Sequence, residues 1–197
     1  MLADILEQRR SYRSLEKIPI ERKTLFQLAI HASLMPSCFN NQPWRFVFIS
    51  SPEQLEKLKT TYSKGNEWAY NASFIVAVVT RDSDDCQLQG KTYAGFDTGM
   101  AVGAMLLSAT EMGLVLHPIA GFDTEKAKEI LGIPKDFTLI TLLIGGKKNP
   151  VILLELTEKQ KEAELQRPPR KKPEEFAFLN RWNNPLRETH IDTSSQT

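Results

Sequence analysis

Histidine and cysteine are scarce in this chain of 197 residues, which has three of the first and two of the second. His31, His117 and His190 are widely separated, and neither an HExxH nor a CxxC spacing occurs, so we expect no metal site. Cys38 and Cys86 are too few for a disulfide framework, which favours a reducing compartment. From these absences we expect a cytoplasmic protein.

The chain also lacks an excess of charge of either sign and a long apolar run. The formal net charge is +1, whereas nucleic-acid-binding domains usually carry a marked basic excess, so we expect no nucleic-acid partner and only a local anion site. Between Asp97 and Glu111 about 13 residues are uncharged, and a bilayer-spanning helix needs roughly 20. The first seven residues lack the basic-then-apolar order of a signal peptide. We therefore expect no membrane partner.

Two common motifs of enzymes are absent as well. No GxSxG occurs, which argues against a hydrolase of the nucleophile-elbow type. No GxGxxG follows a predicted strand, so a nicotinamide nucleotide would have no Rossmann pocket of its own.

Apolar residues recur at helical spacing or in short continuous runs along the first three quarters of the chain. The spacing predicts helices over 2–8, about 20–34, from Pro52 with Ser51 as N-cap, 93–112 with Gly113 as C-cap, and 124–131. Continuous apolar runs predict strands over 45–49, 73–79, 114–116 and 139–144, the second of them covered on both faces. Because helices and strands alternate, we expect one domain of mixed α and β structure over residues 1–197.

The last fifty residues have a different composition. From Gly145 onward the chain is rich in Lys, Glu and Pro, with little apolar content before Phe176, Phe178 and Trp182. A segment with so few apolar anchors seldom folds alone. It either dangles or docks on the rest of the protein or on a second subunit.

A cluster of basic residues follows the first helix. Arg9, Arg10 and Arg13 surround Ser11. Guanidinium groups donate bidentate, charge-assisted hydrogen bonds to phosphate oxygens, so the cluster suits a phosphate. The alternative is a basic turn that is simply solvated.

A polar loop with a proline at each end precedes the first strand. Pro36–Pro43 contains adjacent side-chain amides, which can read a heterocycle edge that carries both C=O and N–H groups. The alternative is a rigid turn whose amides cap backbone groups. In the later loop 117–123, Gly121 would let a flat ligand approach the backbone, or the loop is a plain connection capped by Asp123. The basic segment 167–176 taken alone indicates a solvated tail.

These four elements occur in a fixed order: Arg9-Arg10-Ser11-x-Arg13, Pro36-Ser37-x-x-Asn40-x-Gln42-Pro43-Trp44, Pro118-Ile119-x-Gly121-Phe122-Asp123, and Arg170-Lys171-x-x-Glu174-Glu175-Phe176 with Asn180-Arg181-Trp182. Together they resemble the nitroreductase family of FMN enzymes over residues 5–182. The resemblance implies an α+β fold with a central mixed, mainly antiparallel sheet flanked by helices. It also implies a homodimer with FMN at the interface, across which a tail of about residues 147–197 is exchanged to pack on the partner subunit.

The resemblance also assigns cofactor-binding residues. It implies the FMN phosphate and ribityl contacts for Arg9, Arg10, Ser11, Arg13 and Arg170, flavin contacts from the neighbouring subunit for Pro36, Ser37, Cys38 and Asn40, and positions near the ring for Asn66, Ala120 and Gly121. Three positions depart from the family pattern: Cys38 stands where Ser is common, Ala120 where some members are acidic, and Lys172-Pro173 where Pro-Leu is frequent.

Three glycines on the helix 93–112 bear on the dimer. Gly95, Gly99 and Gly103 share one helix face, and each costs about 1 kcal/mol relative to Ala in a helix interior. Their recurrence indicates that another backbone passes close by, either that of the second subunit or that of the chain's own sheet.

The implied activity is transfer of hydride from NADH or NADPH, through flavin N5, to a small-molecule acceptor such as a nitroaromatic or a quinone. In a ping-pong reaction the cofactor performs the difficult step, so we assign no catalytic residue. The alternatives are a non-catalytic flavin-binding protein and a specialised flavin enzyme of the same fold, such as a dehalogenase or an alkene reductase.

Overall fold

The computed structural model describes residues 1–187, so His190 lies outside the described residues. The chain divides into two compact units, Met1–Leu165 and the segment from Gln166 onward, and each is described by itself.

The helices and strands follow the sequence prediction closely. The α-helices are α1 (Leu2–Gln8), α2 (Arg22–Ser33), α3 (Pro52–Lys59), α4 (Ala94–Glu111), α5 (Thr124–Leu131) and α6 (Glu158–Leu165), with short 3-10 turns η1 (Cys38–Asn40), η2 (Glu67–Asn71), η3 (Asp82–Asp84) and η4 (Pro173–Glu175). The strands are β1 (Leu15–Glu16), β2 (Arg45–Ile49), β3 (Phe74–Thr80), β4 (Gln87–Leu88), β5 (Lys91–Thr92), β6 (Val115–Ile119) and β7 (Thr138–Lys148). Each predicted helix and strand is present, with ends that shift by a few residues.

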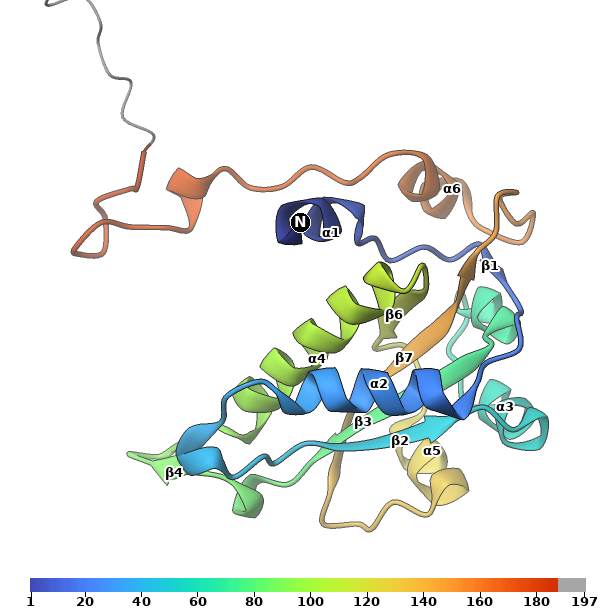
Figure 1. The fold of residues 1–197 in the computed structure, drawn as a ribbon, viewed down its shortest axis with the longest axis horizontal. Helices are drawn as coiled ribbons and strands as arrows, with labels where there is room; N and C mark the ends of the chain where they lie inside the picture. The colour runs from blue at the N-terminus through green and yellow to red at the C-terminus, as the bar shows by residue number, and fades with distance from the viewer. Residues whose placement is uncertain (188–197) are drawn as a thin grey trace, which may run out of the picture. The chain divides into compact units, whose positions relative to one another are not determined.

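A five-stranded sheet forms the centre of the first unit (Figure 1). The long strand β7 pairs with β3 and with β6 along its length and with β1 at its C-terminal end, and β2 completes the sheet beyond β3. Each of these pairings is antiparallel, which confirms the α+β class with a mainly antiparallel sheet.

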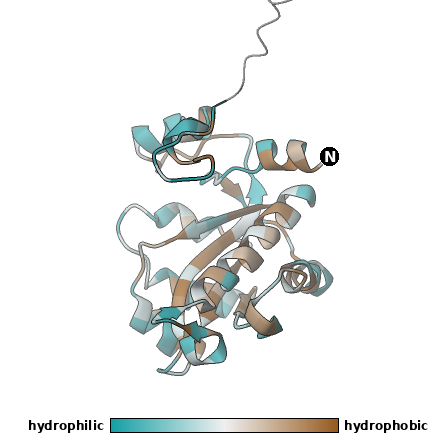
Figure 2. Cartoon of the chain, turned by 90° about the vertical axis from the view of Figure 1, so that its left-hand side faces the viewer, coloured by the Kyte–Doolittle hydropathy of each residue, from teal (hydrophilic) through white to brown (hydrophobic). Residues whose placement is uncertain are grey.

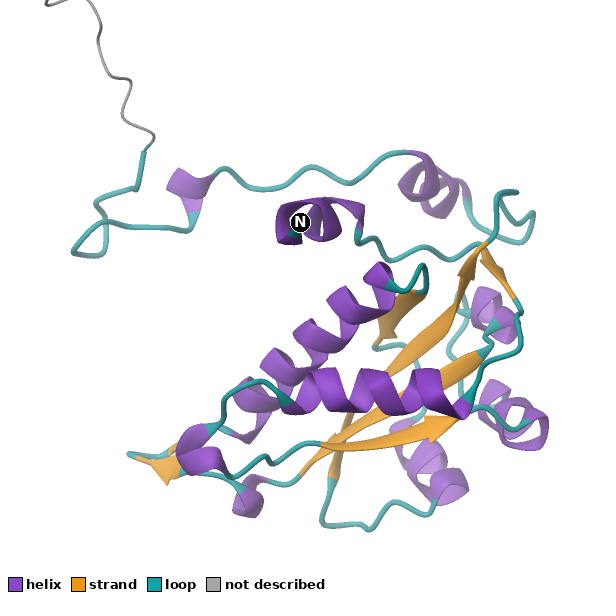
Figure 3. Cartoon of the chain, viewed as in Figure 1, coloured by secondary structure: helices purple, strands orange, loops and turns teal. Residues whose placement is uncertain are grey.

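Helices cover both faces of this sheet, as Figures 1 and 3 show. On one face Phe74, Val76 and Val78 of β3 pack with side chains of α2 and α4, including the buried Leu28 and Met105. The residues between them on β3 belong to a second core on the other face, with Leu58 of α3 and Ala127 of α5. This alternation explains why β3 is a continuous apolar run, and Figure 2 shows the hydrophobic colouring along the central strands.

The helix ends carry the expected caps. The Ser51 hydroxyl accepts a hydrogen bond from the Gln54 backbone N–H at 3.3 Å at the start of α3, and Asp123 does the same for α5. Gly113, just past the end of α4, has a φ of 73°, in the left-handed region that favours glycine.

The segment that follows β7 differs from the predicted tail. Residues 149–165 belong to the first unit: the Asn149 and Leu153 backbone N–H groups donate to Ser14, and Leu156 is buried in the core. A few apolar and backbone contacts therefore suffice to fold this polar stretch onto the main unit. The second unit begins at Gln166 and has contacts of its own, among them the Phe178 and Trp182 rings at 4.6 Å between centroids.

The glycine face of α4 is open in the first unit. A Cβ built at Gly95, Gly99 or Gly103 would meet nothing within 4 Å. The alternative that these glycines accommodate the chain's own sheet is therefore wrong. Among the described residues no helix, α4 included, combines the length and apolar character needed to cross a membrane. The cytoplasmic location stays a prediction.

Candidate functional site

The basic cluster lies on the extended segment between α1 and β1, and its side chains are half-buried. The Arg9 guanidinium donates to the Ser11 hydroxyl at 3.2 Å. Arg10 stacks on the Tyr12 ring at 4.8 Å and donates a short hydrogen bond to the Ala163 carbonyl in the last turn of α6. The carbonyl end of a helix favours a cation, which helps to fix Arg10.

The carboxylate of Glu164 in α6 binds the backbone of this segment. Its two oxygens accept the backbone N–H groups of Arg13 and Ser14, at 2.7 and 3.2 Å. Glu164 is only 5% exposed, and its charge faces Arg13. Burial lowers the pKa of the Arg13 guanidinium, and Glu164 acts in the opposite direction. These hydrogen bonds fix the backbone of the cluster to α6, and the guanidinium groups remain half-buried.

A buried histidine lies next to the basic cluster. His117 on β6 donates from Nδ1 to the Tyr12 carbonyl at 3.1 Å and packs on the Trp68 indole at 4.5 Å between centroids. The pKa of His117 is lowered to about 4, mainly by burial. The charges of Arg13 and Arg9 contribute to this lowering, and the hydrogen bond to the Tyr12 carbonyl opposes it. His117 is therefore neutral at pH 7, and the positive field beside it is available to an anion.

A chain of contacts leads from Arg13 to the Gly121 loop. The Arg13 guanidinium lies 5.9 Å from the centroid of the Trp68 ring, and the Trp68 indole N–H donates to the Asn66 side-chain oxygen at 3.3 Å. The Asn66 amide in turn donates to the Gly121 carbonyl at 2.8 Å. A Cβ at Gly121 would lie 2.6 Å from the Asn66 amide nitrogen, so a side chain there would force this amide to move. The approach of a flat ligand to Gly121 stays a prediction, and Ala120 beside it is exposed.

The polar loop before β2 is held in an unusual conformation. Phe39, Asn40 and Gln42 have φ values of 47°, 58° and 51°, which non-glycine residues seldom adopt. The Ser37 hydroxyl accepts the Gln42 backbone N–H at 2.9 Å and stabilises the turn, while the Phe39 ring is 86% exposed. Such strain persists only where the surroundings enforce it, and it marks functional loops.

A disulfide joins this loop to the segment that precedes α4. Cys38 and Cys86 are bonded, with their Cα atoms 6.0 Å apart. The two cysteines, too few for a disulfide framework, nevertheless form one disulfide, which the sequence did not indicate because they are 48 residues apart and only the fold brings them together. The buried Asp97 near the start of α4 accepts the Cys38 backbone N–H at 2.6 Å and holds the loop from the other side.

The two groups of predicted residues lie at opposite ends of the first unit. In Figure 1 the segment between α1 and β1 lies at the top, by the C-terminal end of α4, and η1 lies at the lower left, by the N-terminal end. One chain therefore brings Arg9, Arg10, Ser11, Arg13, Asn66, Ala120 and Gly121 toward one end, and Pro36, Ser37, Cys38 and Asn40 toward the other. Arg170 is exposed and belongs to the second unit.

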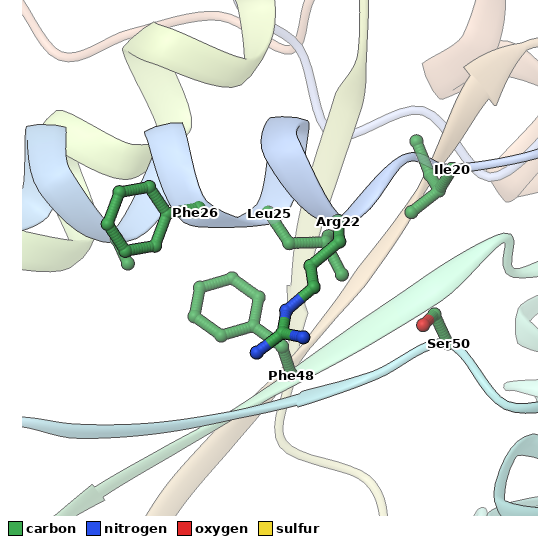
Figure 4. A pocket seen from close by; sticks show the side chains of 7 residues that line it. Ile20, Arg22, Leu25, Phe26, Phe48 and Ser50 are labelled. Carbon is green, nitrogen blue, oxygen red and sulfur yellow. The ribbon is translucent and has the colours of Figure 1, made fainter.

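A pocket of about 450 Å³ opens between α2 and the edge strand β2. Leu25 and Phe26 line it from the helix, and Phe48 lines it from the strand (Figure 4). The Arg22 guanidinium points toward the strand. The pocket is mainly apolar and contains none of the predicted cofactor residues.

Comparison with known proteins agrees with this geometry. The model of the nitroreductase family matches residues 6–66 and 58–147, which include both loops and the basic cluster. The chain belongs to the nitroreductase family. This nitroreductase-family chain is 26% identical over 182 residues to YdgI of Bacillus subtilis, which carries the name of an NAD(P)H nitroreductase; the match covers 73% of this chain and 87% of YdgI.

Solved structures show the same fold as this nitroreductase-family chain. The crystal structure of an oxidoreductase containing FMN superposes with a TM-score of 0.80 at 25% identity, covering 91% of this chain and 92% of that one. A nitroreductase family protein from Clostridium novyi superposes with a TM-score of 0.71 at 20% identity, covering 94% of this chain and 97% of that one.

Three residues that organise the site of this nitroreductase-family chain were not predicted: Glu164, His117 as part of the site, and Trp68. Each acts through contacts distant in sequence, as Glu164 does with Arg13 at a separation of 151 residues. Glu164 lies in a polar segment that gave no signal of burial. His117 does stand directly before the Pro118 motif, which could have indicated its place.

Proposed function

We propose that this protein is an FMN-dependent oxidoreductase that oxidises NADH or NADPH and reduces nitroaromatics, quinones or similar small acceptors in a ping-pong reaction. The observation that carries the proposal is the half-buried guanidinium cluster above the neutral His117, joined through Trp68 to the Asn66–Gly121 contact. Membership of the nitroreductase family and the likeness to an FMN-containing oxidoreductase support it.

The basic cluster fits the phosphate of FMN. Three guanidinium groups lie within five residues, and the nearby carboxylate of Glu164 has both oxygens engaged by backbone N–H groups. The charges of Arg13 and Arg9 add to the larger effect of burial in lowering the pKa of His117, so a positive field from the cluster reaches this residue. A dianionic phosphate would offset this field and accept several charge-assisted hydrogen bonds. Arg9, Arg10, Ser11 and Arg13 would hold it, with Arg170 joining from a C-terminal unit.

The Asn66–Gly121 contact fits the ring end of the cofactor. FMN, when bound, supplies the two-electron redox chemistry, and the protein supplies binding and orientation. Asn66 is fixed by its bonds to Trp68 and Gly121, so its amide presents a defined edge. The exposed Ala120 adds no charge, which leaves the ring face open to a nicotinamide or an acceptor in turn.

The site is complete only in a dimer. The loop residues Pro36, Ser37, Cys38 and Asn40 lie at the far end of α4 from Arg13, so the loop that contacts a given flavin would come from the second subunit. The open glycine face of α4 offers a close approach for the other helix. Exposed apolar side chains of α2 and its C-cap, such as Phe26, Ile30 and Leu34, would extend this interface.

The C-terminal unit would be exchanged between the subunits. The strand β2 ends the sheet, so its outer backbone groups can accept a further strand, and the pocket beside it is apolar. The partner's segment from Gln166 onward carries exposed aromatic side chains, Phe176 and Trp182, that could fill such a pocket. Removing residues 166–197 should therefore weaken the dimer.

The decisive experiment is anaerobic mixing of the purified FMN-loaded protein with NADH or NADPH. We expect the blue absorbance of the flavin to bleach and to recover when a nitroarene or quinone is added. Colour that persists with both nucleotides would refute the oxidoreductase and favour a non-catalytic flavin protein. Bleaching that only an enone or a halogenated aromatic reverses would favour the specialised alkene reductase or dehalogenase. A protein that takes up no FMN would contradict the cofactor assignment.

A further inference from the structure

The disulfide between η1 and the segment before β4 and one neighbouring carboxylate form a compact group of side chains that could bind a metal ion. One ligand atom from each of Cys38, Asp85 and Cys86 lies within 4.8 Å of the other two. Asp85 and Cys86 are buried, each 8% exposed. The three side chains come from two loops that only the fold brings together, and nothing in the proposed oxidoreductase chemistry uses Asp85.

One oxygen of this group has no hydrogen-bond partner. Asp85 Oδ1 accepts the Cys86 backbone N–H at 2.8 Å and the Asn41 side-chain amide at 3.2 Å. Asp85 Oδ2 is buried and has no partner among the described residues. A buried carboxylate oxygen without a partner costs free energy, and a cation would satisfy it.

Further groups make the surroundings favourable to a cation. The buried carboxyl group of Asp97, which accepts the Cys38 backbone N–H, lies beside Asp85. The Asn41 amide is 3.7 Å from Cys86 Sγ, which suits an N–H···S contact to a thiolate. Carboxylate oxygens and a sulfur atom thus lie together as potential ligands for a divalent cation.

We propose that, when the Cys38–Cys86 disulfide is reduced, the two thiolates and Asp85 bind a divalent zinc-type cation. Asp85 and Cys86 have no role in the proposed function, whereas Cys38 lies on the loop that would contact the flavin. The disulfide form excludes the metal, because both sulfurs are then bonded to each other. The loop that contacts the flavin is thus cross-linked in one state and held by a metal in the other.

A dithiol can supply the two electrons and two protons that reduction of the disulfide requires. Exchange between the protein disulfide and a dithiol gives two protein thiols and oxidises the dithiol to its own disulfide. The two thiols then bind the cation and release two protons. Tetrahedral zinc with Zn–S bonds of about 2.3 Å places its two sulfurs roughly 3.7 Å apart. The two sulfurs therefore need to move only slightly apart from their positions in the disulfide. Asp85 gives the third ligand, and water takes the fourth position.

The test compares the oxidised and reduced forms of the FMN-loaded protein. A water-soluble phosphine cleaves the disulfide, taking up oxygen from water as its oxide, and it binds zinc weakly. After addition of zinc and desalting without oxygen, zinc per chain is measured by mass spectrometry. We expect about one zinc per chain in the reduced form and essentially none in the oxidised form. Zinc-free reduced protein, or equal zinc in both forms, would overturn the proposal.

Matched variants locate the site. Asp85→Asn should weaken zinc binding by about tenfold or more, because a charged ligand is lost. Asp82→Asn removes an exposed carboxylate from the same loop, keeps an acceptor for the Thr92 hydroxyl, and should leave binding unchanged. Equal losses in the two variants would contradict the role of Asp85. Cys86→Ser should abolish binding, and if it fails to fold, the Asp85→Asn result and the redox comparison still decide.

Cobalt gives a second readout in the same samples. Tetrahedral thiolate-bound Co²⁺ absorbs in the red, beyond the flavin bands, so its spectrum reports sulfur ligation directly. Absence of these bands in reduced protein that retains cobalt would contradict sulfur ligation. The flavin absorbance of each sample reports FMN content independently, so failure of the metal site and failure of the flavin site are distinguishable.

Discussion

Around Arg13 the chain is held by side chains from distant segments, whereas around Cys38 it is held by a covalent bond and by its own turns. Glu164, Trp68 and His117 fix the first region through hydrogen bonds and ring packing. The second region relies on the disulfide and on Asp97, with three residues at positive φ. Both regions flank the same helix, α4, yet they depend on different physics.

This difference has a functional meaning. The Arg13 region holds positive charge beside a neutral buried histidine on a backbone fixed by hydrogen bonds. This arrangement suits the binding of an anion without a conformational change. The Cys38 region stores backbone strain and carries the exposed Phe39, an arrangement suited to a surface that meets another molecule. In our proposal each flavin needs one region from each subunit, so neither can bind the cofactor well alone.

The largest effect is expected where the two regions would be brought together. Gly99→Leu places a bulky side chain on the open face of α4, where the chain itself leaves room. We expect the fold to survive while the dimer dissociates and FMN is lost. Sedimentation velocity and flavin absorbance measure both, with Glu129→Leu on the opposite side of the sheet as control. A Gly99→Leu dimer with full FMN would refute the α4 interface.

The next largest effect is a loss of stability at acid pH that arises from His117 in the Arg13 region. His117 has a pKa of about 4 in the folded chain against about 6.5 in an unfolded chain, so the unfolded state binds more protons between these values. Stability is therefore full above pH 6.5 and falls as the pH drops toward 4, by about 3 kcal/mol in total. Urea unfolding at several pH values measures this loss.

Replacement of His117 by Asn should flatten the acid side of that profile, while His31→Asn on the other face controls for loss of a histidine. Bound FMN should also reduce the slope, because its phosphate offsets the field of Arg9 and Arg13. A profile that keeps its full acid slope in His117→Asn would show that other groups cause it.

The smallest effect is expected from the basic cluster alone. Arg13→Ala should weaken FMN binding by about tenfold to a hundredfold, the loss of one charge-assisted contact, with little change in fold. Fluorescence titration with FMN measures the affinity. Arg81→Ala, which removes ion pairs to Asp84 and Asp136 elsewhere on the surface, serves as the matched control. Unchanged affinity in Arg13→Ala would move the phosphate site away from Arg13.

The sequence allowed much of the fold to be predicted because the signals are local. Ser51 and Pro52 start α3 within a single turn, and the apolar run of β3 indicates a strand covered on both faces. The family motifs likewise indicated which loops form the candidate site. Local patterns of this kind are read from a few neighbouring residues.

Contacts between distant residues could not be predicted. The bond between Cys38 and Cys86 and the hydrogen bond from Arg13 to Glu164 depend on how the whole chain folds. The start of the tail was misplaced for the same reason, since residues 149–165 look polar and yet pack on Ser14. Burial of a polar segment depends on its partners, which its own composition does not reveal.

The close contact between Asn66 and Gly121 also constrains how this site can evolve. A side chain at position 121 would force the Asn66 amide out of its present place, so changes at the two positions should be coupled. Among relatives, an alanine at the equivalent of 121 should accompany a smaller residue at the equivalent of 66. A lineage that made this exchange would give up the fixed amide that we propose for the ring end of the cofactor site.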